Sequence, residues 1–551
     1  LAMSTGKICC LVLLTLGVLA VVVALVVILT QPKCGPQRYL HGAVAADTET
    51  CSVIGRDILK SGGTAVDAAI AALICTSVMN PQSSGLGGGV IFTIYNASTG
   101  TVEVINARET VPREFPRNLL SHCAAVLFCF SGSPWIGVPG ELRGYEEAHK
   151  RYGRLPWKAL FEPTLKLLSE PLLISPQLFF FLGDTFRWPA LQQTLKAVAE
   201  NGATAFYGGQ IGKALVEDIR KAGSNISLED LQAYKAEVSS ALNVTLNNHT
   251  TVFSPGPPMG GAVLMFILKI LEGKFLREKG QQEVSSLATP EEKVETYHRI
   301  AEALKFGNML KPHMSDPAFS KAQVSWHGTA ELVRRRIDTR GDHPLDHYNF
   351  LESFYNHSYK SRGTSHISVL AADGSAVSAT STINFPFGSF VYSNQTGIIL
   401  NNELADFCMA NRSIKPGDHM EGIILSASAL GEKPPSAMAP SILISKTGDM
   451  LVIGGAGGTR IISATTMAII NKLWFGYDLE HAISAPIMHT EGASILFEKH
   501  FSEEVRSGLL RRGHKEKLNE FAMNVVQGIS KEGKCISAYS DKRKLGKSAG
   551  Y

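Results

Sequence analysis

A glycine-rich stretch, Gly454-Gly455-Ala456-Gly457-Gly458, is the first candidate for chemistry. It follows the strand-like residues 450–453 and precedes a helix that we expect to begin near Thr459. Backbone N–H groups between a strand and a helix lie at the positive end of the helix dipole, where they bind a phosphate or stabilise an oxyanion. The stretch lacks the Lys-Ser/Thr of a phosphate-binding loop and the spacing of a dinucleotide fingerprint. A tight structural turn is the alternative.

Two further motifs match known chemistry by coincidence. Residues 546–550 fit the Gly-x-Ser-x-Gly elbow of serine hydrolases, but no strand is expected before them and little room remains for a helix after them. Arg340-Gly341-Asp342 fits an adhesion tripeptide that is common in unrelated sequences. Neither motif is interpreted as a site.

The most specific signal lies in residues 364–388, which begin Thr364-Ser365-His366-Ile367-Ser368 and contain a long run of small hydroxyl residues before Asn384. This stretch is similar to the signature of the γ-glutamyltransferases. The resemblance continues through Asn106-Ala107-Arg108-Glu109, Asn401-Asn402-Glu403 and residues 456–458. Residues 80–83, 135–145 and 549–551 resemble the leukotriene-cleaving branch of that family, often called type 5.

The resemblance implies an α+β fold, the four-layer αββα sandwich of the N-terminal-nucleophile hydrolases. It also implies self-cleavage between Gly363 and Thr364. We therefore expect three parts: a cytoplasmic tail and anchor over residues 1–30, a large subunit over 31–363, and a small catalytic subunit over 364–551. The two subunits would remain together as a heterodimer.

The implied chemistry suits a threonine at a new N-terminus. A free α-amino group has a pKa of about 7.7–8.0, so it can act as the general base for the Thr364 hydroxyl. Attack on a γ-glutamyl bond would give an ester, which water hydrolyses or an acceptor amino acid intercepts. The resemblance implies glutathione, its S-conjugates and leukotriene C4 (converted to leukotriene D4) as substrates, and no cofactor or metal.

Substrate-binding residues follow from the matching positions. Arg108 matches the residue that grips the substrate α-carboxylate, and a planar guanidinium suits such a bidentate pair. Glu403 and Asp406 match the carboxylates that bind the α-ammonium, and Ser436 matches a hydroxyl on the carboxylate. Without the resemblance, each would be interpreted as an ordinary structural or surface residue.

Residues close to the nucleophile are assigned in the same way. Gly457 and Gly458 would supply the oxyanion amides, in agreement with the loop chemistry above. Thr382 and Asn384 match residues that hold Thr364 and the substrate. His366 is expected to be structural or to act through its neighbours.

The chain departs from the family pattern in two places. Pro435-Ser436-Ala437 carries one serine where the family usually has two, and the missing hydrogen bond to a charged group is worth about 1.5–3 kcal/mol. The large subunit also looks shorter than the family's around residues 179–188. These departures motivate an alternative, a catalytically weak or inactive cell-surface binding ectodomain of the same fold.

The elements that must position these residues can be read from periodicity. Residues 51–80 predict two helices around Gly62-Gly63, the second beginning at a capping box of Thr64 and Asp67. Strands are expected at 90–95 and 102–105, and helices over most of 140–340. Residues 364–370 and 376–382 predict a hairpin around Asp373-Gly374, and residues 441–445 and 450–453 predict a second hairpin.

Residues 8–29 are uncharged and apolar, about the length that crosses a bilayer, so they predict a signal-anchor helix; a signal peptide is the alternative. Seven glycosylation sequons follow this segment and none precedes it. They favour a type II plasma-membrane protein with an extracellular body. The sequons begin at Asn96, Asn225, Asn243, Asn248, Asn356, Asn394 and Asn411.

Composition narrows the remaining classes. A content of 45% hydrophobic and 19% charged residues indicates a folded protein, and the net charge of +4 gives no reason to expect a nucleic-acid partner. Nine cysteines without a Cys-x-x-Cys motif make a zinc site improbable on sequence grounds. The family's spacing implies a Cys51–Cys75 disulfide, which an oxidising compartment would permit.

The predicted topology can be tested on protein expressed in cells. Glycosidase treatment should increase the gel mobility of the large subunit, which carries the sequons Asn96 to Asn356. A cytosolic polypeptide whose mobility does not change would contradict the predicted orientation.

Overall fold

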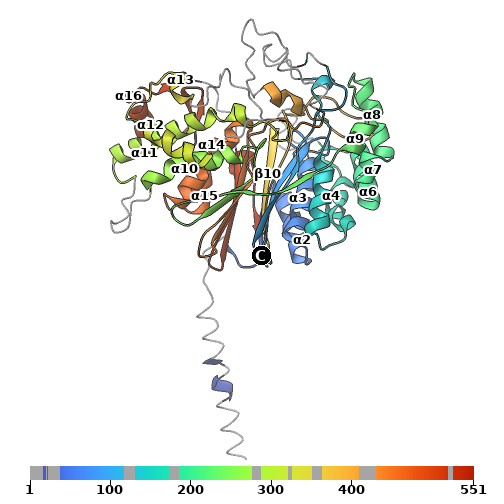
Figure 1. Ribbon diagram of the computed structural model, residues 1–551. Coiled ribbons are helices and arrows are strands. Elements are labelled where there is room, and N and C mark those ends of the chain that lie inside the picture. The colour runs from blue at the N-terminus through green and yellow to red at the C-terminus, as the bar shows by residue number, and fades with distance from the viewer. Residues whose placement is uncertain are drawn as a thin grey trace, which may run out of the picture.

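The computed structural model describes residues 16–19, 21–22, 38–116, 119, 131–173, 185–275, 287–319, 326–349, 363–408, 430–518 and 525–551. Two seven-stranded sheets lie face to face in this part of the chain, and helices cover both outer faces (Figure 1). The order of layers is helix, sheet, sheet, helix. This arrangement agrees with the expected α+β sandwich.

The first sheet is antiparallel throughout, with β10 and β11 near its centre. The turn between these two strands contains Gly374 with φ +87°, a conformation that favours glycine. In order across the sheet the strands are β19 (Ala549–Gly550), β2 (Ala43–Ala45), β10 (Gly363–Leu370), β11 (Ala376–Asn384), β3 (Gly89–Asn96), β4 (Thr101–Ala107) and β7 (Glu237–Ser240).

The second sheet is also antiparallel, and its inner face packs on the first through small and branched side chains such as Ala45, Leu370, Val452 and Ile529. Its central strand β13 leads into the glycine-rich stretch. In order the strands are β1 (Arg38–Tyr39), β18 (Cys535–Ser540), β17 (Val525–Glu532), β13 (Met450–Ala456), β12 (Ser441–Ile444), β9 (Thr251–Ser254) and β8 (Leu242–Thr245).

Helices on the outer face of the first sheet surround α3, which packs on β10 and β11. They are α2 (Glu49–Lys60), α3 (Ala65–Met79), α4 (Glu141–Tyr152), α5 (Glu162–Leu168), α6 (Pro189–Asn201), α7 (Thr204–Tyr207), α8 (Gln210–Lys221) and α9 (Leu228–Ala233). Beside them lies a small sheet of β5 (Leu172–Leu173) and β6 (Thr185–Phe186).

Helices on the other outer face surround α14, which packs on β13 and β17. They are α10 (Gly261–Phe275), α11 (Pro290–Asn308), α12 (Trp326–Arg336), α13 (Leu345–Tyr348), α14 (Ile461–Leu473), α15 (Leu479–Ser484) and α16 (Glu503–Arg511). A three-stranded sheet of β14 (Met488–Glu491), β15 (Ser494–Phe497) and β16 (Lys515–Glu516) accompanies them.

The first helical pair confirms its prediction. Thr64 caps α3, and the Thr64 backbone and Asp67 carboxylate complete the capping box. The Cys51–Cys75 disulfide joins α2 to α3 with their Cα atoms 5.3 Å apart. Cys408 and Cys535 are also disulfide-bonded.

Residues 237–254 differ from the expected helical character, because they form the strands β7, β8 and β9. The three strands extend the edges of both sheets. They are short and partly exposed, so their sequence gives little period-2 contrast between buried and exposed positions.

The expected membrane anchor falls largely outside the described residues, of which only 16–19 and 21–22 belong to it and are helical. Within the described part of the chain, no helix is both long and apolar enough to cross a membrane. Among the sequon asparagines, Asn225, Asn243 and Asn394 are exposed and Asn96 and Asn248 are half-buried. Asn356 and Asn411 lie outside the described residues.

Candidate active site

In the antiparallel first sheet, neighbouring strands alternately begin and end at the same edge of the sheet. β10 begins there with Gly363 and Thr364, and β11 ends there at Asn384. The register places Thr364 opposite Thr382. β4 ends there at Ala107, so that Arg108 follows directly.

A small buried cavity lies at this edge, with a volume of about 10 Å³. That volume is roughly what one water molecule needs. Six of the residues assigned by sequence share its wall with four others; the lining is Thr364, Thr382, Glu403, Asp406, Ser436, Ala437, Met438, Gly458, Thr459 and Ile461. Residues from strands, a 3₁₀ helix and loops up to about a hundred positions apart are thus brought together.

The carbonyl oxygen of Gly363 accepts hydrogen bonds from two hydroxyls. Thr364 Oγ1 donates to it over 2.7 Å, and Thr382 Oγ1 donates over 2.6 Å. The backbone N–H of Asn384 in turn donates to Thr382 Oγ1 over 2.8 Å. This chain of donors polarises the Gly363 carbonyl and places the Thr364 hydroxyl beside it.

Asn384 connects the residues around Thr364 to the acidic residues. Its φ of +75° is unusual for a residue with a side chain, and its Nδ2 donates to Asp406 Oδ1 over 3.0 Å and to the Asn402 carbonyl over 3.1 Å. Asp406 and Glu403 belong to the 3₁₀ helix Glu403–Cys408. Thr382 and Asn384 therefore hold both the Gly363 carbonyl and the Asp406 carboxylate.

Arg108 is completely buried and forms ion pairs with both predicted ammonium-binding residues. Its guanidinium pairs with Glu403, and its Nη2 donates to Asp406 Oδ2 over 2.5 Å. The carbonyls of Pro434 and Pro435 accept from the same side chain, each over 3.1 Å. The sequence did not indicate that Arg108 and the two carboxylates would bind one another.

A third acidic side chain lies near Arg108, because Glu109 is 3.6 Å away. Burial raises the pKa of Glu109 to about 7, although the charge of Arg108 opposes this. Burial also raises the pKa of Glu403 well above its ordinary value, again against Arg108. Burial would lower the pKa of Arg108, but the neighbouring carboxylates raise it overall. Burial thus favours the protonated carboxyls of Glu109 and Glu403 beside a firmly charged guanidinium.

The glycine-rich stretch runs beside the nucleophile's strand. Gly457 and Gly458 have φ values of +122° and +62°, so this bend favours glycine at both positions. A Cβ at Gly454 would lie only 2.3 Å from the ring of His366, which fills the space between β10 and β13. His366 Nδ1 forms a hydrogen bond of 2.8 Å with Thr380 Oγ1. Burial lowers the pKa of His366 to about 3, so the ring is a neutral packing group.

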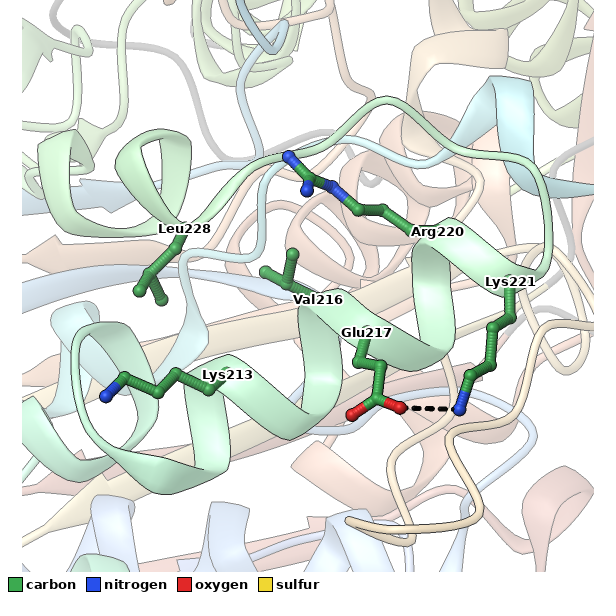
Figure 2. A pocket seen from close by; sticks show the side chains of 6 residues that line it. All are labelled: Lys213, Val216, Glu217, Arg220, Lys221 and Leu228. Carbon is green, nitrogen blue, oxygen red and sulfur yellow. Dashed lines mark hydrogen bonds and ion pairs between the residues drawn. The ribbon is translucent and has the colours of Figure 1, made fainter.

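Size alone does not identify the site. A larger hollow of about 540 Å³ lies along α8. Figure 2 shows the side chains that line it, among them the ion pair of Lys221 and Glu217, whose charged atoms are 2.6 Å apart. The described residues that line it include no hydroxyl, thiol or buried acid; they are Lys213, Val216, Glu217, Arg220, Lys221 and Leu228. This surface offers no equivalent of the polarised carbonyl at Gly363.

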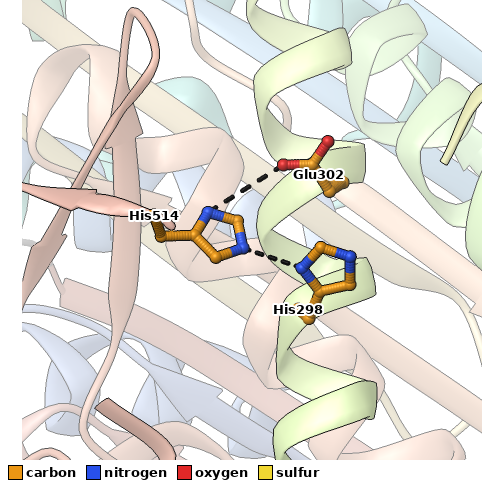
Figure 3. Close-up of side chains that lie close together, drawn as sticks. All are labelled: His298, Glu302 and His514. Atoms are coloured by element: carbon orange, nitrogen blue, oxygen red, sulfur yellow. Dashed lines mark hydrogen bonds and ion pairs between the residues drawn. The ribbon is translucent and has the colours of Figure 1, made fainter. Parts of the chain in front are cut away.

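A buried cluster of His298, Glu302 and His514 has the donor atoms of a metal site (Figure 3). His298 Nδ1 and His514 Nε2 lie 2.8 Å apart. The ammonium of Lys305 already occupies the position of a cation, 3.0 Å from Glu302 Oε1 and 2.9 Å from His514 Nδ1. The Lys305 ammonium also donates to the hydroxyl of Tyr348 over 3.1 Å. The cluster is thus satisfied as a hydrogen-bonded network that joins α11, α13 and the segment before β16.

Several residues of the site escaped the sequence assignment. Glu109 directly follows Arg108 and was quoted only as part of a motif, although its burial makes it part of the charge balance. Asn401 positions Glu403 by accepting from its backbone N–H over 2.9 Å. Lys544, from the segment next to the rejected elbow motif, donates to the Thr364 carbonyl over 2.7 Å. Of these three, only Glu109 and Asn401 could have been found from the sequence, because they stand in the same motifs as assigned residues.

Comparison with known proteins decides the family. A family model described as Gamma-glutamyltranspeptidase matches residues 51–183 and 177–551. The chain belongs to the gamma-glutamyltranspeptidase family. It is 48% identical to the human glutathione hydrolase 5 proenzyme, over 100% of both chains, and 48% identical to that of Rattus norvegicus, over 98% of both. These relatives confirm the resemblance to the type 5 branch.

Solved structures agree on the fold of this family member. A cephalosporin acylase from Bacillus halodurans superposes with a TM-score of 0.78, covering 95% of this chain and 99% of the acylase at 21% identity. At that identity the similarity shows the fold alone. The two stretches matched by the family model meet at residues 177–183, where the sequence looked shorter than the family pattern.

The pairing of Arg108 predicts separate effects for two substitutions. Arg108→Lys keeps a cation among the buried carboxylates but loses the planar fork, so the protein should fold while KM for a γ-glutamyl substrate rises roughly 10- to 150-fold. Arg108→Ala leaves the carboxylates without a cation and should also lower the thermal midpoint. Steady-state kinetics and thermal unfolding measure the two effects. Wild-type KM in Arg108→Lys would contradict the proposed contact.

The histidine network predicts acid sensitivity. Burial lowers the pKa of His514 to about 2 and also lowers that of His298. Because an unfolded histidine binds a proton below about pH 6.5 and folded His514 does not, stability present above pH 6.5 is lost as pH falls, by about 2 kcal/mol at pH 5 for His514. His298 contributes a loss in the same direction.

Thermal unfolding between pH 7 and pH 5 measures this loss. His514→Gln should weaken the pH dependence, whereas the same change at exposed His500 should leave it unaltered. An equal pH dependence in wild type and His514→Gln would show that His514 does not contribute.

Proposed function

We propose that the chain is a γ-glutamyl hydrolase and transferase that cuts itself between Gly363 and Thr364 and then uses Thr364 as its nucleophile. The observation that carries this proposal is the pair of hydroxyls on the Gly363 carbonyl, from Thr364 at 2.7 Å and Thr382 at 2.6 Å. It is supported by the relatives, which are named glutathione hydrolases. Glutathione and its S-conjugates are therefore the proposed substrates.

This geometry supports self-cleavage. Thr364 Oγ1 attacks the Gly363 carbonyl carbon, and negative charge develops on the oxygen to which Thr382 donates. The C–N bond then breaks and the proton of the Thr364 hydroxyl passes to the leaving nitrogen, which leaves Gly363 as an ester on Thr364 and frees the Thr364 amine. Water hydrolyses the ester and releases the Gly363 carboxylate. Two subunits result, over residues 31–363 and 364–551 if the segment over residues 1–30 is the anchor.

Catalysis repeats the same attack on a substrate. The freed amine of Thr364 takes the proton from its own hydroxyl, which attacks the γ-carbonyl of the substrate. Gly458 lines the cavity with Thr364, which supports its amide and that of the adjacent Gly457 as the proposed donors to the oxyanion. The resulting γ-glutamyl ester is released by water or by the amine of an acceptor amino acid.

Substrate recognition is an exchange of ion pairs. The α-amino and α-carboxylate groups of a γ-glutamyl compound form a zwitterion. Its carboxylate would replace Glu403 and Asp406 on the Arg108 guanidinium, and its ammonium would take over the two released carboxylates. The buried Glu109 lies beside this exchange, 3.6 Å from the guanidinium. Ser436 remains as a hydroxyl near the carboxylate, and Ala437 in the cavity wall adds none.

We extend the proposal to location and to a lipid-derived substrate. The sequons that follow the apolar residues 8–29 support a type II cell-surface enzyme with its catalytic body outside. The resemblance to the type 5 branch supports leukotriene C4, converted to leukotriene D4, as one substrate. Competition between leukotriene C4 and glutathione for the purified ectodomain measures this preference.

Substitution of Thr364 tests both halves of the proposed chemistry. Thr364→Ala removes the attacking oxygen, so the chain should remain uncut and inactive. Thr364→Ser keeps a hydroxyl and should still mature and retain some turnover. Intact-mass analysis, N-terminal sequencing of the small subunit and glutamate release from glutathione are the measurements. An active enzyme that stays a single chain, or a small subunit that begins elsewhere, would refute the assignment.

A further inference from the structure

A lysine from the C-terminal segment binds the nucleophile's own carbonyl. Lys544 Nζ donates to the Thr364 carbonyl oxygen over 2.7 Å and to Ser365 Oγ over 3.3 Å. The same nitrogen pairs with Asp47 Oδ2 over 2.7 Å. Lys544 is only 9% exposed and Asp47 is fully buried. None of the chemical steps above uses this lysine.

The strand geometry explains why a side chain is needed there. β2 pairs with β10 only at Ser368, Val369 and Leu370, so the beginning of β10 extends beyond the end of its neighbour on that side. A buried carbonyl must find a donor. At Thr364 the ammonium of Lys544 supplies it in place of a strand N–H.

The position of Lys544 is itself firmly determined. The preceding Arg543 pairs with Glu498 and with Asp541, the latter at 2.9 Å. Its guanidinium also donates to the carbonyls of Ile483, Ser484 and Ala485. Asp541 accepts from the N–H of Val526 over 3.2 Å, which ties the segment to β17. On the far side, Gln527 donates to Asp47.

We propose that Lys544 is a positioning residue for the reaction of Thr364. By holding the carbonyl of that residue, it fixes the backbone from which the attacking hydroxyl projects. Its importance grows after the cut, because Thr364 then loses its covalent link to Gly363 and is attached to the chain only through its own carbonyl side. The proposal rests on the proposed function, since it assigns a role within that reaction.

A purely structural ion pair between Lys544 and Asp47 is the competing explanation, and a double variant separates the two. Lys544→Met alone removes the contact with Thr364 and also leaves Asp47 buried without its cation. Asp47→Asn combined with Lys544→Met removes the contact without leaving that charge. Lys547→Met, at a lysine of the same segment whose side chain is 67% exposed, is the matched control.

The experiment measures self-cleavage by intact mass and steady-state hydrolysis of glutathione per cut small subunit. Because Lys544 contacts the backbone of Thr364, Lys544→Met should lower kcat by about tenfold or more while KM stays within about twofold. Where cutting is incomplete, the rate of self-cleavage should fall by the same factor. The double variant should regain thermal stability but remain slow. Lys544→Arg should recover part of the rate, and Lys547→Met should match wild type.

Wild-type cutting and kcat in Lys544→Met would overturn the proposal, and so would their recovery in the double variant. A rise in KM without a change in kcat would also overturn it. Thr364→Ala is included in parallel. Activity in that variant would refute the proposed function itself, and such a failure is distinguishable from a failure of Lys544 alone.

Discussion

A guanidinium with no exposed surface imposes the main constraint on this site. Arg108 cannot be left in the interior without carboxylates and carbonyls around it, because the cost of an unpaired buried charge is several kcal/mol. Meeting that requirement draws together the end of β4, the 3₁₀ helix Glu403–Cys408 and the carbonyls of Pro434 and Pro435. Two of the groups that satisfy Arg108, Glu403 and Asp406, are the ones that the zwitterionic substrate would replace under the proposed function, which would make stability and recognition depend on shared contacts.

The closed cavity fits the uncut state of the chain. In this state the carbonyl of Gly363 occupies the place beside the Thr364 hydroxyl that a substrate carbonyl needs. The remaining space holds about one water. Under the proposed function, cutting would release the Gly363 carbonyl from Thr364, and exchange of the Arg108 ion pairs would then admit the zwitterion. Self-cleavage and substrate turnover would thus use one arrangement of hydroxyls.

The elements around Thr364 could be predicted from the sequence because their signals are local. The Asp373-Gly374 turn, flanked by alternating residues, is enough to predict β10 and β11. The register Thr364↔Thr382 differs by one residue from that of a two-residue turn, because Ala371 bonds to Ser375 across a three-residue loop. The Thr64–Asp67 capping box likewise depends on a spacing of three residues. The residues of the site itself were assigned through the family resemblance, not through periodicity.

What the sequence did not show depends on contacts between distant segments. Glu403 lies almost three hundred positions after Arg108, and nothing in either motif indicates that the two side chains pair. Lys544 and Thr364 are 180 positions apart, and the segment around Lys544 drew attention only as a coincidental motif. The strands β7, β8 and β9 were missed for a related reason, since short edge strands gain their order from the sheets they join.

The account depends on Thr364 carrying the γ-glutamyl group during turnover. The most direct measurement is mass spectrometry of the small subunit after rapid mixing with glutathione and an acid quench, followed by peptide mapping. The account predicts a mass increase of one γ-glutamyl group on the peptide that begins at Thr364, absent from protein quenched before substrate is added. A γ-glutamyl group found on a different residue would contradict it.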